Sequence, residues 1–311
     1  MSETSITSTS TKKQAPAPKK QKTPVHQLSP RAKMLHRALR HKGLLFGLFV
    51  MAIIVIVALF APLLAGHDPY SQSLLARMKP PVFLGGTWEH PLGTDALGRD
   101  YLARLVYGAR ISLLIGLIAA TISACIGTFM GVLAGYFGGR IDLIVTFFIN
   151  VRLAMPVVLV ALAVVALFGG SLLVVVSVLG LLLWDRFAVV MRAATMQVRK
   201  LEYVAAAQVL GASLPRVLFK DILPNVMNHL IVIFTLEMAH AIILEAALSF
   251  LGLGVQPPTP SWGLMISEGK EMLLFESWLI TIPGVALFFL VLSINMLGDG
   301  IRDVTAPEGR N

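Results

Sequence analysis

Glu237, His240 and Glu245 are ionisable residues inside a largely apolar run of the sequence, residues 226–248. Glu237 and His240 are three residues apart, which places them one turn apart on one face of a helix, and Glu245 follows two turns after Glu237. A charge at mid-membrane costs roughly 2.5–3.5 kcal/mol, so such residues usually face a cavity or a partner. The Glu237–His240 pair therefore has two interpretations. It lines a pore, where it meets an amine or a metal cation, or it locks this segment to a neighbouring one.

A second group of charges lies in the polar segment 65–110 and comprises Asp95, Arg99, Asp100 and Arg104. These residues either contact a partner protein or form local ion pairs that cap a short interfacial helix. Exposed ion pairs contribute only about 0–1 kcal/mol each, so pairing alone explains the group poorly. We therefore favour docking or gating for Asp95, Arg99 and Asp100.

The sequence offers no constellation that is typical of an enzyme. It contains neither a Ser/His/Asp set nor a recognisable metal-ligand motif, and it lacks the Gly-x-x-x-x-Gly-Lys-Ser/Thr loop that cradles nucleotide phosphates. The single cysteine, Cys125, excludes an internal disulfide and a multi-cysteine zinc site. We expect no catalytic residue, no metal site and no cofactor bound by this chain.

The composition places these residues in a membrane protein. Of the 311 residues, 56% are hydrophobic and only 14% are charged, and the mean hydropathy is +0.77. Soluble domains are nearer half apolar and a quarter charged, so the excess apolar area must face lipid. The net charge of +9 does not indicate nucleic-acid binding, because ten of the 26 Lys and Arg residues precede the first apolar run. Basic residues at that position attract anionic headgroups instead.

Apolar runs predict an all-α integral membrane protein with about six transmembrane helices. The predicted spans are residues 44–64, 111–134, 143–168 with Pro156 inside, 172–190, 226–248 and 278–297. We divide the chain into a disordered basic cytosolic tail (1–42, whose stretch 31–42 is a candidate surface helix), a first span with an outer loop (43–110), a five-helix core with a cytosolic loop at 191–226 (111–303) and a C-terminal tail (304–311). Cytosolic segments would then hold 18 Lys and Arg residues and outer loops six, which favours both termini in the cytosol.

The loop 191–226 predicts two short helices at an angle. Residues 202–210 are rich in alanine and favour a helix, and Gly211 suits a left-handed cap. Ser213 can cap a second helix with Pro215 in its first turn, and Pro224 is expected to end it. Such a knob either docks into a groove on a partner protein or rests on the bilayer as an amphipathic connector.

This loop resembles the EAA loop of ABC-importer permeases, whose coupling helix sits in a cleft of the ATPase subunit. The family usually has a glutamate before the paired alanines, where this chain has Ala205, and Glu202 one turn earlier can compensate. The matching positions are Glu202, Tyr203, Ala206, Ala207, Gly211, Ala212, Ser213, Arg216, Leu223, Pro224 and Asn225.

Other motifs resemble the C-type permease of the dipeptide, oligopeptide and nickel importers. They occur in the expected order at residues 90–100, 107–113, 244–263 and 297–303, so the resemblance covers about residues 30–303. Glu245 belongs to the third of these motifs, and we favour a structural or gating role for it near the outer end of its span.

The resemblance implies a type I ABC-importer-like permease fold in a bacterial inner membrane. It also implies a heterodimer with a homologous permease, two ATPase subunits that hold ATP and Mg²⁺, and an extracytoplasmic substrate-binding protein that Asp95, Arg99 and Asp100 would contact. The expected cargo is a di- or oligopeptide. Two alternatives are the same machinery importing nickel or an oligosaccharide-like solute, and a secondary transporter driven by protons through Glu237 and His240.

Overall fold

The computed structural model describes residues 30–305, and all regular secondary structure in this range is helical. Five helices are long and apolar enough to cross a membrane, and a bent helix pair brings the number to six if it forms one span. The predicted all-α architecture with about six spans is therefore confirmed. The tail predictions for 1–29 and 306–311 lie outside the described residues.

The amino-terminal part is a helix followed by the first span. α1 (Pro30–Arg40) matches the predicted basic helix, and its last turn carries Arg37 and Arg40. α2 (Lys42–Leu59) is the first span and continues into the short α3 (Ala61–Leu64). His41 begins α2 by accepting a hydrogen bond from the Leu44 backbone N–H and contacts Asp303 at 3.0 Å. The beginning of the first span is thereby joined to the end of the last one.

The second span is longer than the apolar run suggested. α4 (Tyr101–Phe137) begins ten residues before the predicted start, because Asp100 caps it and the next ten residues pack against other helices. Gly127, Gly131 and Gly135 form a stripe at four-residue spacing along α4, and the backbone of α8 (Trp184–Val198) occupies the space where their Cβ atoms would lie. Small residues permit such a close approach between membrane helices.

The third predicted span is broken. α5 (Gly139–Ala154) and α6 (Val157–Phe168) meet at an angle of 83° around Met155 and Pro156. Met155 is extended, with ψ 125°. This is the conformation that a following proline imposes, because its ring excludes the α region for the residue before it. The third span predicted at 143–168, with Pro156 inside it, is therefore a helix pair bent at the proline.

The fourth span joins two helices, α7 (Leu172–Leu182) and α8, so it reaches Val198 and not residue 190. The cytosolic loop predicted to begin at residue 191 is correspondingly shorter. After α9 (Glu202–Val209), α10 (Leu214–Arg216) passes through a π-helical turn, η3 (Val217–Ile222), into α11 (Leu223–Phe250).

Pro224 does not end a helix, contrary to the prediction. It sits in the first turn of α11, where the missing N–H of proline is tolerated, and the wider π turn before it leaves room for the ring. Residues 214–250 consequently form one continuous rod, in place of a short helix followed by a separate span.

The last part of the chain contains a short helix that we did not predict, α12 (Trp262–Gly269), with a 3₁₀ turn, η4 (Lys270–Met272). α13 (Trp278–Thr305) follows and extends eight residues beyond the predicted end. α2 lies along α13, α13 along α11, and α11 along α4. The apolar core between α4, α6, α7 and α11 includes Ile115, Val165, Leu179 and Leu248.

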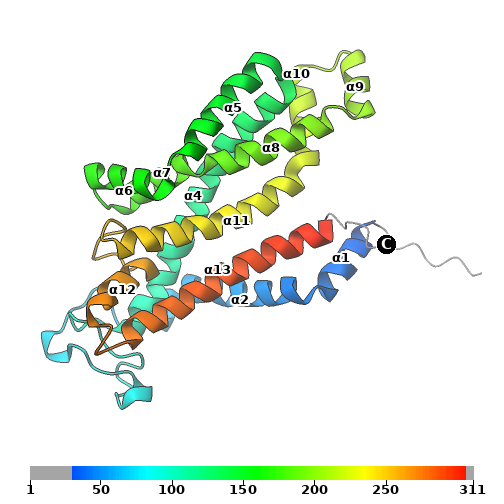
Figure 1. Cartoon of the computed structure of the whole chain (residues 1–311). Coiled ribbons are helices and arrows are strands. Elements are labelled where there is room, and N and C mark those ends of the chain that lie inside the picture. Colours follow the sequence, from blue (N-terminus) through cyan, green and yellow to red (C-terminus); the bar gives the residue numbers. More distant parts are fainter. Residues whose placement is uncertain (1–29, 306–311) are drawn as a thin grey trace, which may run out of the picture.

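The two ends of the helical bundle differ in what they carry (Figure 1). α9, α10, α1 and the end of α13 lie at one end, and α12 lies at the other with the loop 65–100, which contains η1 (Leu74–Ala76) and η2 (Val82–Leu84). This arrangement places the three groups of predicted site residues at three levels: one at each end and one between them.

Candidate translocation and coupling sites

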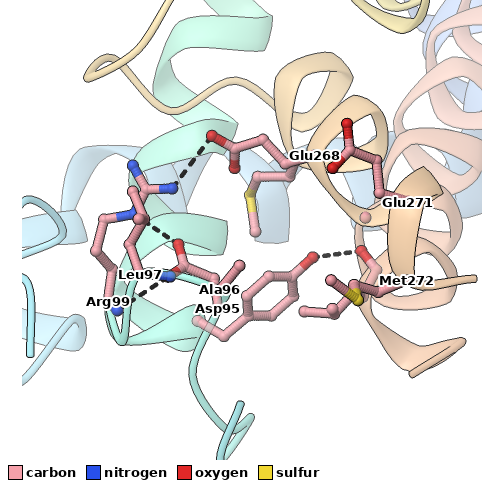
Figure 2. A pocket seen from close by; sticks show the side chains of 11 residues that line it. Asp95, Ala96, Leu97, Arg99, Glu268, Glu271 and Met272 are labelled. Atoms are coloured by element: carbon pink, nitrogen blue, oxygen red, sulfur yellow. Dashed lines mark hydrogen bonds and ion pairs between the residues drawn. The ribbon is translucent and has the colours of Figure 1, made fainter. Parts of the chain in front are cut away.

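A buried ionic cluster joins the outer loop to α4 and α12. The Asp95 carboxylate contacts Arg99 Nε and Arg104 Nη1, each at 2.6 Å. Glu268 of α12 contacts the same two guanidinium groups, Arg99 at 3.1 Å and Arg104 at 2.6 Å. Figure 2 shows Asp95 and Arg99 on the loop side of a cavity, with Glu268 and Glu271 on the helical side.

These ion pairs are buried, although from the sequence we treated them as exposed. The side chains of Asp95, Arg99 and Arg104 are 6%, 5% and 1% exposed, and only Glu268, at 29%, reaches the solvent appreciably. Asp95 also accepts backbone hydrogen bonds from Leu97 and Arg99. The cluster is therefore a packed joint between three segments. Docking by Asp95 and Arg99 stays a prediction that would require this joint to open.

Asp100 faces a different group of residues. Its Oδ1 accepts the Ala103 N–H at 2.7 Å, which caps α4, and its Oδ2 lies 2.8 Å from His90 Nδ1 and 3.6 Å from His67 Nδ1. The capped helix is the long second span and not a short interfacial helix. The fold also brings together two histidines and an aspartate that are separated along the chain and that no sequence motif marked as potential metal ligands. The expectation of no metal site stays a prediction.

In the middle of the bundle, Glu237 bridges α8 and α11. The residue is fully buried, and its two carboxylate oxygens contact Arg186 Nη1 at 3.0 Å and His240 Nδ1 at 3.2 Å. The predicted proximity of Glu237 and His240 is confirmed. Arg186 was missed as a partner because only the packing of α8 on α11 brings it near. Its side chain is 55% exposed, so the ion pair has one buried and one accessible member.

Glu245 ties α11 to the beginning of α12. It is 1% exposed, and its Oε1 accepts hydrogen bonds from Ser249 at 2.8 Å and Ser261 at 2.9 Å. Ser261 in turn caps α12 by accepting the Leu264 N–H. Because a buried carboxylate needs such donors, Glu245 fixes the position of α12. This geometry fits a structural role, and gating by Glu245 stays a prediction.

At the opposite end, α9 and α10 form the predicted bent hairpin. Gly211 adopts a left-handed conformation, with φ +79°, and its N–H and that of Ala212 donate to the carbonyls of Gln208 and Ala207, both at 3.0 Å. This is the hydrogen-bonding pattern of a glycine cap. Ser213 occupies the N-cap position of α10, but its side chain accepts no capping hydrogen bond, which differs from the prediction.

The hairpin is anchored on one side and exposed on the other. Val204 is fully buried against Val217 and Ile222, and the Tyr203 hydroxyl donates to the Asp221 carbonyl at 3.2 Å. Of the eight predicted coupling residues, Ala207 and Ala212 are half-buried, and the other six are exposed: Glu202, Tyr203, Ala206, Gly211, Ser213 and Arg216.

Three large apolar side chains on this knob were missed by the sequence argument. Val209, Leu210 and Phe219 are 87%, 86% and 68% exposed. They follow no motif, and their exposure became evident only from the angle between the two helices. Large exposed apolar side chains on a protruding element are typical of a protein interface.

Two family models match the sequence of this chain. Residues 127–310 match the family described as binding-protein-dependent transport system inner membrane component, which covers more than half of the chain. The chain belongs to this family. Residues 29–81 match a second model, the N-terminal transmembrane domain of oligopeptide transport permease C. The family assignment makes the chain a multi-pass membrane permease, and the C-type resemblance inferred from its motifs is confirmed.

Curated relatives match nearly end to end. The chain is 42% identical over 272 residues to the di/tripeptide transport system permease protein DppC of Pseudomonas aeruginosa, covering 87% of this chain and 90% of the relative. It is 36% identical over 270 residues to the oligopeptide transport system permease protein OppC of Bacillus subtilis, covering 87% of each.

A solved structure supports the fold. The chain resembles a chain of the MetNI methionine ABC transporter in inward-facing conformations, with a TM-score of 0.54 and 18% sequence identity. The match covers 65% of this chain and 96% of the other. The expectation of an ABC-importer permease fold is confirmed, with additional elements in this chain beyond the shared core.

Proposed function

We propose that this chain is one of two homologous permease subunits that form the path for di- or oligopeptides through an ATP-driven importer. The observation that carries this proposal is the near end-to-end match to peptide permeases at up to 42% identity, which includes the N-terminal segment. A substrate-binding protein outside the membrane would deliver the peptide. The localisation we propose is the bacterial inner membrane, with no role in nucleic-acid binding.

The α9–α10 hairpin is the proposed contact with one of two ATPase subunits. The hairpin and the following η3 carry the exposed apolar residues Val209, Leu210 and Phe219 together with the predicted coupling residues around Gly211. α10 continues through η3 into the rod ending at Phe250, so displacement of the knob can be transmitted along α11 past Glu237. ATP and Mg²⁺ would bind on the ATPase subunits, and this chain would be a transport subunit without enzymatic activity.

The mechanism we propose is a two-state shift. ATP binding favours a closed pair of ATPase subunits, and the docked hairpins move with these subunits. Docking to the closed pair shifts the permease from its inward-open to its outward-open form, because the free energy of docking differs between the two forms. Peptides at neutral pH carry an amine and a carboxylate. The Arg186–Glu237 ion pair presents matching charges at the middle of the bundle, with Arg186 accessible. It is the proposed contact point of the peptide in transit.

Glu237→Gln tests this contact. The amide keeps the shape of the side chain but removes the charge that faces Arg186 and His240. We expect a several-fold loss of peptide uptake, with altered preference among peptides of different charge and with normal amounts of protein in the membrane. The control is Glu271→Gln, at an exposed carboxylate of η4 to which no transport role is assigned. If Glu237→Gln leaves the kinetics and the peptide preference unchanged and only lowers the thermal midpoint, the pair is structural.

We further propose that both termini and the hairpin face the cytosol. This rests on the threefold excess of Lys and Arg in the corresponding segments and on the common location of α1, α9, α10 and the end of α13. Tags at either terminus should resist external protease in intact spheroplasts and be digested after lysis. Digestion in intact spheroplasts would overturn this topology.

Uptake of radiolabelled peptides tests the proposed function. Cells that lack only this chain should fail to accumulate labelled di- or tripeptides, and expression of the chain should restore accumulation that depends on ATP. Radioactive nickel and labelled oligosaccharides are measured in parallel. Restored uptake of either of these without peptide uptake would contradict the peptide proposal, and uptake that persists without ATPase subunits would contradict the importer itself.

A further inference from the structure

Two histidines and an aspartate from separate parts of the outer loop meet beside the amino end of α4. His67 follows α3, His90 lies between η2 and α4, and Asp100 is the cap of α4. One potential ligand atom from each residue lies within 4.8 Å of the other two. Nδ1 of His90 and Nδ1 of His67 are 2.8 and 3.6 Å from the same oxygen, Asp100 Oδ2.

These distances are close to those around a bound transition-metal ion. Zinc binds imidazole nitrogen and carboxylate oxygen at about 2.0–2.2 Å, which places neighbouring ligand atoms of a tetrahedral site about 3.3 Å apart. Small movements would reach that geometry, and His67 has the freedom to make them because its side chain is 48% exposed. The ring of His90 is only 12% exposed, and that of His67 lies 5.1 Å from it.

Asp100 is held in the orientation that such a site needs. Its Oδ1 accepts the Ala103 N–H, which leaves Oδ2 directed at the two imidazoles. The same hydrogen bond caps the N-terminus of α4. The carboxylate therefore lies between the positive end of the helix and the position that a bound ion would take. Fixing a ligand through a second hydrogen bond is the usual way in which proteins orient metal ligands.

The surroundings favour a cation. The three residues line a cavity of about 320 Å³ that is also lined by Asp68, Glu89 and Lys79. The three carboxylates of Asp68, Glu89 and Asp100 thus outnumber the single ammonium group of Lys79. Lys79 contacts Glu89 at 3.3 Å, and this is the one contact of the Lys79 ammonium group with a carboxylate among the described residues. Arg99 of the outer loop and Arg104 of α4 instead contact Asp95 and Glu268.

We propose that His67, His90 and Asp100 bind a divalent transition-metal ion of the zinc class, with water completing the coordination. The mixture of two imidazoles and one carboxylate suits zinc and its neighbours better than magnesium or calcium, which prefer oxygen ligands alone. The ion would clip the segment after α3 to the beginning of α4 and so close the outer loop 67–100. This proposal is independent of the transported solute.

Zinc titration of the purified chain tests the site. The chain is isolated in detergent through a tag without histidine, treated with a chelator and titrated with Zn²⁺ by calorimetry, while thermal unfolding is followed in parallel. We expect binding of about one ion per chain and a rise in the thermal midpoint. His67→Ala and His90→Ala should each weaken binding about tenfold or more, since even indirect ligand contacts contribute that much. His36→Ala, an exposed histidine on α1, should bind as the unaltered chain does.

Asp100→Asn separates metal binding from folding, because the amide oxygen can still accept the Ala103 N–H while the charged ligand is lost. We expect this variant to remain folded and to bind Zn²⁺ about tenfold or more weakly. Mg²⁺ should leave the thermal midpoint of the unaltered chain unchanged. The absence of saturable zinc binding, or binding by His67→Ala or Asp100→Asn with the affinity of the unaltered chain, would show that the three residues only form a hydrogen-bonded helix cap.

Discussion

Replacing Gly211 by valine is expected to abolish peptide uptake while the chain still inserts into the membrane. Gly211 has φ +79°, and no heavy atom lies within 4 Å of the position that its Cβ would take. Valine therefore causes no clash there. The left-handed conformation costs an L-residue about 1–2 kcal/mol, so we expect valine to leave it. Leaving it changes the angle between α9 and α10. A shift of about 1.4 kcal/mol corresponds to a tenfold change in an equilibrium, and we expect at least that loss of uptake.

Two further variants separate the angle of the hairpin from general strain. Gly211→Asn should retain most of the uptake, because asparagine tolerates the left-handed conformation. Gly85→Val introduces the same kind of strain in the outer loop, at φ +93° and again with no atom within 4 Å of the Cβ position, and should transport normally. Uptake by Gly211→Val at the level of Gly85→Val would refute the coupling role of the bend.

The second large effect is expected from Asp95→Ala at the other end of the bundle. This substitution removes one of the two carboxylates that neutralise Arg104, whose side chain is 1% exposed. Among the described residues, Nε and Nη2 of Arg104 already lack hydrogen-bond partners. Breaking a buried ion pair from one side typically costs about 3–5 kcal/mol, because the remaining charge is left uncompensated. Thermal unfolding in detergent should show a correspondingly large loss.

An exposed ion pair of the same loop provides the matched control. Glu89→Ala removes the partner of Lys79, and both of these side chains are accessible to water. We expect no measurable change in its thermal midpoint. Asp95→Asn should lie between the two, since its amide oxygen can still accept the backbone N–H groups of Leu97 and Arg99. If Asp95→Ala were as stable as Glu89→Ala, the buried joint would contribute nothing to the fold.

The sequence predicts most of the helical framework because membrane spans are governed by local composition. Each predicted span is helical in the structure, although the third is divided into α5 and α6 at Pro156 and the fourth joins α7 and α8. The bend at Gly211 was also predictable, since glycine adopts the left-handed conformation of a helix cap without the steric cost that a Cβ atom would add. The proximity of Glu237 and His240 could be predicted from the helical repeat alone.

Features that depend on contacts between distant segments could not be predicted in the same way. Arg104 and Glu268 are 164 residues apart, and the burial that makes their contact important exists only after α12 packs against α4. The start of α4 at Tyr101 was missed for the same reason, because polar residues there are satisfied by tertiary partners. The two prolines behaved oppositely. Pro156 breaks a span, whereas Pro224 is accommodated next to a π turn that no local pattern indicates.

The central claim is that the α9–α10 hairpin docks onto a separate ATPase subunit. Co-purification tests this claim most directly. The chain is isolated from its native membrane in mild detergent, and the associated ATP hydrolysis is measured together with that of a Leu210→Asp variant. A Leu75→Asp variant, altered at a fully exposed leucine of the outer loop, serves as the control. We predict that ATP-hydrolysing subunits accompany the unaltered chain and the Leu75→Asp variant and are lost from Leu210→Asp. A chain that purifies without any such subunit, from membranes that still import peptide after the ATPase subunits are deleted, would contradict the account.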